Sequence, residues 1–218
     1  MSAYTAGQSM SVTVISVLVT SVTVITTLVG MGRWEPDAHG RLIRAALELY
    51  AERGFEQTTV ADIAQRASVT ERTFFRYFTD KREVLFDGST ALQELVVGAI
   101  ASAPASVAPV DAVAAAMEGA ASLLQERREF ARQRAAVIAS NPSLQERELL
   151  KLARLGAAAA GELRRRGVPP STATLAAESG VTVFRVAFEQ WIGDPRSGDF
   201  ARCIRDALDQ LKALTAGS

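Results

Sequence analysis

The spacing of apolar residues from about residue 40 onward is the feature that most restricts the fold of this chain. Apolar side chains recur there every three or four positions, and no convincing run alternates at every second residue as a strand would. The first block places one stripe along a helix, formed by Leu42, Ile43, Ala46, Leu47 and Tyr50. We therefore predict an all-α protein.

Capping residues and chain breakers divide this region into helices. Thr59 with Asp62, and Asp80 with Glu83, have the spacing of capping boxes, and Thr70 is placed to cap a further helix. The N-terminal helices are predicted at 37–53, 60–67, from Thr70 to about Phe78, and from Asp80 to about Ile100. Longer helices are predicted at 111–140, 143–166, 172–192 and 198–214.

Composition removes several classes of function. Lys+Arg and Asp+Glu both number 24, so a nucleic acid would have to be met by local patches rather than by a global positive field. Cys203 is the only cysteine and His39 the only histidine, which argues against disulfides, metal sites and His-based catalysis. We predict no metal, no cofactor and no enzymatic activity, with Cys203 buried and His39 at a helix start.

The segment SVTERTFFRYFTDK, residues 68–81, combines aromatic and cationic side chains. On a helix, Phe74 and Phe78 point the same way and Phe75 lies at the margin. The opposite arc carries Arg72, Thr73, Arg76 and Tyr77. Arginine can bind guanine or phosphate, threonine a thymine methyl or phosphate, and tyrosine a phosphate oxygen. This arc is suited to the major groove of double-stranded DNA, although a solvated amphipathic helix would also carry such residues.

The neighbouring residues favour a helix-turn-helix over the solvated helix. Two capped helices are separated by a short turn. Thr58 and Thr59 stand at the start of the first helix, where we expect them to face phosphate, and Lys81 follows the second. We include Thr70, the cap of the second helix, among the predicted DNA-binding residues.

The sequence LIRAALELYAERGFEQTTVADIAQRASVTERTFFRYFTDKREVLF, residues 42–86, resembles without gaps the DNA-binding domain of TetR-family repressors. By matching positions, the resemblance implies DNA contacts by Thr59, Glu71, Arg72, Thr73, Phe75, Arg76, Tyr77 and Lys81. Ser68 departs from the family, which has glycine in this turn. Serine there is strained if its φ is positive.

The C-terminal half resembles, less specifically, TetR regulators that bind acyl-CoA-like ligands. Four arginines could hold a CoA phosphate, or could form a solvated face: Arg127, Arg128, Arg132 and Arg134. The Ala-rich stretch 153–160 favours close helix approach over room for an acyl chain. Phe184, Phe188 and Trp191 form a stripe on the penultimate helix. The resemblance implies that the last two helices form a dimer interface, and the stripe could serve as core or interface.

The first thirty residues do not fit this plan. Residues 11–29 are uncharged, alternate Val or Ile with Ser or Thr, and contain a ten-residue repeat. We interpret 1–32 as an extension that is disordered or non-native, with a flexible arm or a membrane-associated segment as alternatives. We assign 33–82 to the helix-turn-helix domain and 83–218 to a helical ligand-binding and dimerisation domain.

The leading hypothesis is a cytoplasmic homodimeric transcriptional repressor without membrane contact. It would bind a palindromic DNA operator and be released by a small hydrophobic or acyl-CoA-like effector. One alternative is a membrane-tethered all-α interaction protein, which depends on residues 11–29 alone. The other is a small all-α enzyme, which would need a nucleophile, base or metal cluster that the sequence does not offer.

Overall fold

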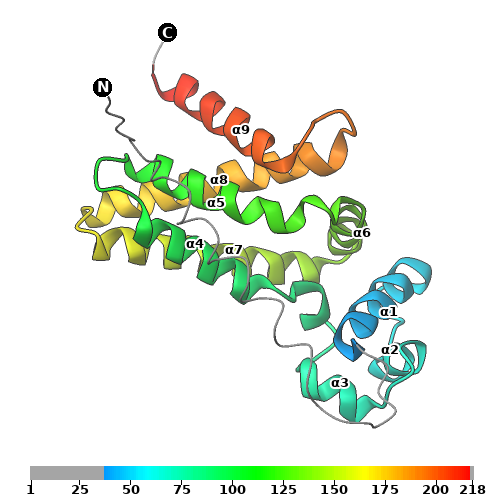
Figure 1. The fold of residues 1–218 in the computed structure, drawn as a ribbon. Helices are drawn as coiled ribbons and strands as arrows, with labels where there is room; N and C mark the ends of the chain where they lie inside the picture. The colour runs from blue at the N-terminus through cyan, green and yellow to red at the C-terminus, as the bar shows by residue number, and fades with distance from the viewer. Residues whose placement is uncertain (1–36, 217–218) are drawn as a thin grey trace, which may run out of the picture. The chain divides into compact units, whose positions relative to one another are not determined.

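The computed structural model describes residues 37–216, and within that range all regular structure is helical (Figure 1). The prediction of an all-α fold is confirmed. The extension predicted at 1–32 lies outside the described residues. The helices are α1 (Ala38–Arg53), α2 (Val60–Arg66), α3 (Glu71–Tyr77), the 3-10 helix η1 (Glu83–Phe86), α4 (Ser89–Ser102), α5 (Pro109–Gln125), α6 (Arg128–Ala139), α7 (Pro142–Arg165), α8 (Pro170–Gly193) and α9 (Phe200–Thr215).

Helices α1, α2 and α3 form the first unit of the fold. The capping box of Thr59 and Asp62 begins α2, and Thr70 caps α3 by accepting from the amide of Thr73. Because α2 and α3 have seven residues each, packing must hold them in place. Leu42, Ile63 and Phe74, one from each helix, are fully buried together.

The chain between α2 and α3 turns at Ser68, whose φ is 54°. This is the left-handed conformation that glycine adopts without strain, so the serine at this position carries the cost that the sequence predicts.

The prediction of a single helix from Asp80 to about Ile100 is wrong over its first turns. Asp80 does accept hydrogen bonds from the amides of Arg82 and Glu83, but the turn that follows is the 3-10 helix η1. Gly88, with φ of 82°, ends this turn, and α4 begins after it. By length and composition alone, residues 83–102 could cross a membrane. The bend at Gly88, however, divides them into the two helices η1 and α4.

The helix predicted at 111–140 is also two helices. The chain bends at Arg127, whose φ and ψ are −114° and 24°, and α6 starts at the next residue. The bend brings Arg128 to the C-terminal end of α8, where it donates to the carbonyls of Trp191 and Asp194. The next helix, α7, is capped by Asn141, whose side chain accepts from the amides of Ser143 and Leu144.

Helices α4 to α9 share a second core that contains many small residues. The expectation of close approach around 153–160 is confirmed, since Ala159 and Ala160 are buried and Gly156 lies against Glu178 of α8. Helices α5 and α8 are closer still. A Cβ added at Gly180 would lie 2.2 Å from Cγ1 of Val113.

The close contact between α5 and α8 at Gly180 predicts that two glycine-to-alanine substitutions in helices change protein stability in opposite directions. Gly180→Ala should lower the free energy of unfolding by about 1–3 kcal/mol, because Val113 would be overpacked. Gly156→Ala should raise it by up to about 1 kcal/mol through helix propensity, because the nearest atom is the movable carboxylate of Glu178. Urea denaturation of both variants checks this. Equal stability of the two would contradict the close α5–α8 contact.

Candidate nucleic-acid interface

The outer face of α3 is the most open cluster of aromatic and cationic side chains among the predicted site residues. Arg72, Phe75, Arg76 and Tyr77 are exposed, and 55% of the surface of Phe75 is open to solvent. A shallow hollow of about 550 Å³ is lined by Arg72, Thr73, Phe75 and Arg76. The structure therefore brings four of the predicted DNA-binding residues together on one surface.

Two phenylalanines on the opposite side hold this surface in place. Phe74 is completely buried and Phe78 is 4% exposed, as predicted from their spacing. The ring of Phe74 packs against Phe78 with a centroid distance of 5.5 Å and against the edge of Phe75 at 5.4 Å. Rotation of α3 would expose Phe74 and Phe78 to solvent, so their burial fixes the direction in which the exposed side chains project.

The two arginines of the outer face have different surroundings. Arg76 donates from Nη2 to the hydroxyl of Tyr77 at 3.0 Å, and its guanidinium lies 4.9 Å from the centre of the Tyr77 ring. Among the described residues, Arg72 has no hydrogen bond or ion pair. Its guanidinium donors are available for a bidentate contact with a base or a phosphate.

Thr59, Thr70 and Glu71 lie at helix starts and are exposed. The hydroxyl of Thr59 donates to Asp62 at 2.6 Å and accepts from its amide at 3.1 Å. The hydroxyl of Thr59, and with it the backbone amide of Thr59, which donates to the same carboxylate at 2.8 Å, hold the pKa of Asp62 below its usual range, so the carboxylate that completes the capping box stays ionised. DNA contacts by these three residues remain a prediction.

Two residues of the predicted set have other roles in the structure. Thr58 was expected to face phosphate, but it is fully buried and its hydroxyl donates to the carbonyl of Gly54 at 2.9 Å. The ammonium group of Lys81 donates to the carbonyls of Phe55 at 2.8 Å and Thr58 at 2.9 Å. The prediction of direct DNA contact by Thr58 is therefore corrected. Thr58 and Lys81 both fix the loop between α1 and α2, and a DNA contact by the partly exposed Lys81 remains a prediction.

Comparisons with known proteins agree with this geometry. Residues 42–87 match the bacterial regulatory proteins of the tetR family, and residues 107–216, just over half of the chain, match the MftR C-terminal domain. The chain belongs to the TetR family. It is therefore a transcriptional regulator with a DNA-binding helix-turn-helix and a C-terminal ligand-binding domain, and it is not an enzyme.

Three individual proteins are similar to this TetR-family regulator over different shares of its length. It is 42% identical to the transcriptional regulator TcmR of Streptomyces glaucescens over 35% of this chain and 34% of TcmR, so that match spans only about a third of the relative. It is 28% identical to a protein named as the mycofactocin biosynthesis regulator MftR of Mycobacterium tuberculosis, over 84% of this chain and 93% of MftR. The structure of Bacillus subtilis FadR in complex with stearoyl-CoA matches with a TM-score of 0.57 and 21% identity, covering 79% of this chain and 97% of FadR.

The four arginines predicted to hold a CoA phosphate do not converge in this TetR-family regulator. Arg128 binds backbone carbonyls at the end of α8, and Arg134 donates to the carbonyl of Leu85 at 2.5 Å and to Glu148 at 3.0 Å. Arg132 pairs with Glu129 on its own helix, while Arg127 is exposed. The prediction of a phosphate site formed by this set is wrong, because two of its members are structural.

The aromatic stripe of α8 lies in the core of the C-terminal domain. Trp191 is fully buried and stacks on Phe200 of α9 at 4.9 Å, while Phe184 is 7% exposed. The ring of Phe188 packs against both Trp191, at 6.0 Å, and Phe200, at 5.8 Å. Of the two roles left open for this stripe, the structure supports the core, and the prediction of these three residues as a dimer interface is corrected.

Sequence reasoning missed several contacts that position the helix-turn-helix. His39 stacks on Phe78 at 5.3 Å and lies 3.1 Å from Asp87, so the single histidine joins α1 to the turn before α4. Asn141 donates to Glu56 at 2.9 Å, and Arg147 and Lys151 of α7 both bind Glu83. The partners lie 39 to 85 residues apart, and no local motif links them.

Proposed function

We propose that this TetR-family regulator is a cytoplasmic homodimeric repressor that binds a palindromic operator and is released by a hydrophobic effector of the acyl-CoA class. The observation that carries the proposal is the outer face of α3, where Arg72, Thr73, Phe75 and Arg76 stand on a buried aromatic base. One such helix per subunit fits one major groove. Two subunits related by a two-fold axis therefore call for a palindrome.

The outer face of α8 supports the proposed homodimer. Leu175, Ser179, Thr182 and Val186 follow one another at spacings of four, three and four residues, so they lie on one side of the helix. None of them is charged, and Leu175 and Val186 are 70% and 43% exposed. This stripe faces away from the buried aromatic residues and provides a self-complementary surface for a second copy.

The effector proposal rests on the C-terminal domain. Its core is apolar and lined by small side chains between α5, α7 and α8, and separation of these helices would admit an alkyl chain. The relative FadR of Bacillus subtilis has a structure with stearoyl-CoA bound. We therefore propose that the acyl chain enters this core, with the CoA phosphates bound by residues other than the structural Arg128 and Arg134.

A gel shift tests the proposal directly. The full chain is titrated onto the DNA upstream of its own gene, with and without stearoyl-CoA, and free CoA and stearate serve as controls. We expect a discrete complex that stearoyl-CoA dissolves and free CoA does not. A protein that binds this DNA no more tightly than unrelated DNA would contradict the operator proposal, and a complex insensitive to stearoyl-CoA would contradict the effector proposal.

A further inference from the structure

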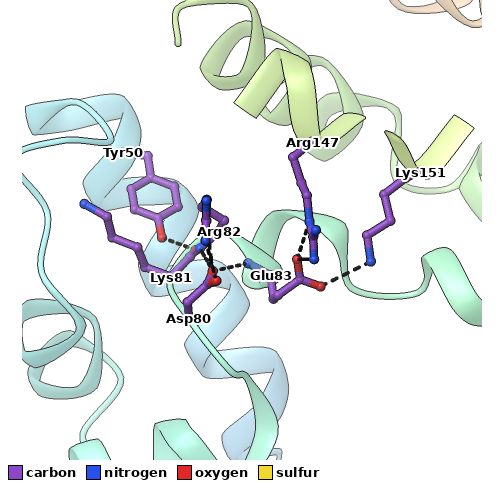
Figure 2. Close-up of polar contacts among 7 residues, drawn as sticks. All are labelled: Tyr50, Asp80, Lys81, Arg82, Glu83, Arg147 and Lys151. Carbon is purple, nitrogen blue, oxygen red and sulfur yellow. Dashed lines mark hydrogen bonds and ion pairs between the residues drawn. The ribbon is translucent and has the colours of Figure 1, made fainter. Parts of the chain in front are cut away.

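Glu83 is the residue through which the turn after α3 forms ion pairs with α7 of the C-terminal domain. Its carboxylate accepts from Nε of Arg147 at 2.7 Å and Nη2 at 2.5 Å, and from Nζ of Lys151 at 3.2 Å (Figure 2). Arg147 and Lys151 stand one turn apart on α7, so both reach one carboxylate. We call these three residues the Glu83 latch. We propose that this latch transmits movement of α7 to the recognition helix α3, with Glu83 as a positioning residue for operator binding.

On the DNA-binding side, Glu83 belongs to a turn that is fixed to α1 and α2. The hydroxyl of Tyr50 donates to the carbonyl of Lys81 at 2.6 Å, and Asp80 accepts from the amides of Arg82 and Glu83 (Figure 2). The ammonium group of Lys81 closes the loop between α1 and α2. Burial, and secondarily the charge of Asp80, raise the pKa of Tyr50, so this hydroxyl remains a donor at physiological pH.

The same turn is rigidly tied to α3. Only Phe78 and Thr79 separate the last residue of α3 from Asp80, and Phe78 is buried with Phe74. A displacement of the turn must therefore move the end of α3. Because Arg72, Phe75 and Arg76 project from this short helix, a small rotation changes their fit to a groove.

On the effector side, the latch is attached to a helix that lines the small-residue core. Arg147 and Lys151 lie on the same helix as the buried Leu155 and Ala159. Arg134 adds a second hold through the carbonyl of Leu85 and through Glu148 of α7. An effector that separates α7 from α8 would therefore pull on η1, and this step rests on the effector site proposed above.

The burial of the latch sets it apart from the exposed Glu129–Arg132 ion pair of α6. The side chains of Glu83 and Lys151 are 20% and 19% exposed, whereas Glu129 and Arg132 are 62% and 61% exposed on one helix. A partly buried, bidentate and charge-assisted contact between two units can carry coupling energy. The exposed Glu129–Arg132 pair lies within α6 and joins no second element, so it cannot carry this coupling energy. It therefore serves as a matched control.

The experiment compares Glu83→Gln with Glu129→Gln in the full chain. For each protein, operator affinity is measured with and without stearoyl-CoA, and the ratio gives the coupling factor. We expect Glu83→Gln to reduce this factor about tenfold, the effect of about 1.4 kcal/mol of lost coupling. Stearoyl-CoA affinity of the DNA-free protein should change less than about twofold. Glu129→Gln should match the parent in both measurements.

A second variant and a second readout complete the test. Arg147→Gln/Lys151→Gln should lose the same coupling as Glu83→Gln, and the triple variant should lose no more, since all three changes break one interaction. Backbone amide hydrogen exchange, measured without effector or DNA, should accelerate about tenfold in residues 80–86 of Glu83→Gln but not of Glu129→Gln.

These readouts separate failure of the latch from failure of the proposed effector. If stearoyl-CoA does not release the parent protein, the effector proposal has failed, and the latch then requires that Glu83→Gln, unlike Glu129→Gln, both accelerates exchange in residues 80–86 and changes operator affinity. If the amide hydrogen-exchange rates of residues 80–86 in Glu83→Gln then equal those of the parent, the latch proposal is overturned. If stearoyl-CoA does release the parent, an unchanged coupling factor in Glu83→Gln overturns the latch even when exchange has accelerated, because the pair would then be structural only.

Discussion

Phe74→Ala will destabilise the protein by about 3–5 kcal/mol, the range for removing a large aromatic side chain from a core. Phe74 is fully buried beside Phe78 in the centre of the first unit. Helices α2 and α3 have too few residues to persist without this packing. Thermal denaturation followed by circular dichroism should show a clearly lower melting temperature.

The adjacent residue provides a matched control for this change. Phe75→Ala removes the same side chain from the neighbouring position, where 55% of the residue surface is exposed. It should change the free energy of unfolding by less than about 1 kcal/mol and reduce operator affinity instead. An unchanged melting temperature of Phe74→Ala, or equal destabilisation by the two variants, would mean that α3 is rotated relative to the structure described here.

The local features of the DNA-binding unit could be predicted from sequence because their causes are local. The capping box of Thr59 and Asp62 depends on residues three positions apart, and the burial of Phe74 and Phe78 follows from helical periodicity. The same reasoning failed at Thr58. Two adjacent threonines look alike in sequence, but the backbone turns the first of them toward the carbonyls of Leu49 and Gly54.

Features that depend on distant partners could not be predicted. The run of arginines from 127 to 134 suggests one anionic ligand, yet Arg128 caps α8 and Arg134 holds η1. Whether an arginine meets a ligand or a carbonyl depends on which element folds against it, and no short motif encodes that. The bend at Arg127 could not be predicted for the same reason. It places Arg128 against the carbonyl of Trp191, more than sixty residues further along the chain.

The aromatic stripe of α8 shows how periodicity can find a face without finding its partner. Phe184, Phe188 and Trp191 do share one side of the helix, but that side meets Phe200 of α9 in the same chain. Leu175 and Val186 on the opposite side are the exposed apolar residues of α8 that the proposed homodimer would use. A sequence pattern gives the apolar side of a helix, whereas the choice between core and interface requires the position of the neighbouring helix.

Arg72→Ala should cause the largest loss of operator affinity of any change on α3. A bidentate contact between arginine and guanine contributes about 1–3 kcal/mol of discrimination, and a homodimer carries the change in both half-sites. If the two sites are additive, the complex loses about 2–6 kcal/mol. Arg72 is exposed and has no hydrogen bond or ion pair within residues 37–216, so its removal should leave the fold intact. Circular dichroism and the melting temperature should match the parent.

Arg132→Ala removes the same charge from the exposed surface of α6 and serves as the control for net charge. Affinity measured across a salt series then distinguishes two roles for Arg72. If it reads a base, the variant loses preference at one base pair of each half-site while the salt dependence stays near that of Arg132→Ala. If it binds phosphate, affinity falls evenly across sequences and the salt slope drops by about one per contact. Parental affinity of Arg72→Ala at every salt concentration would show that α3 does not present this residue to DNA.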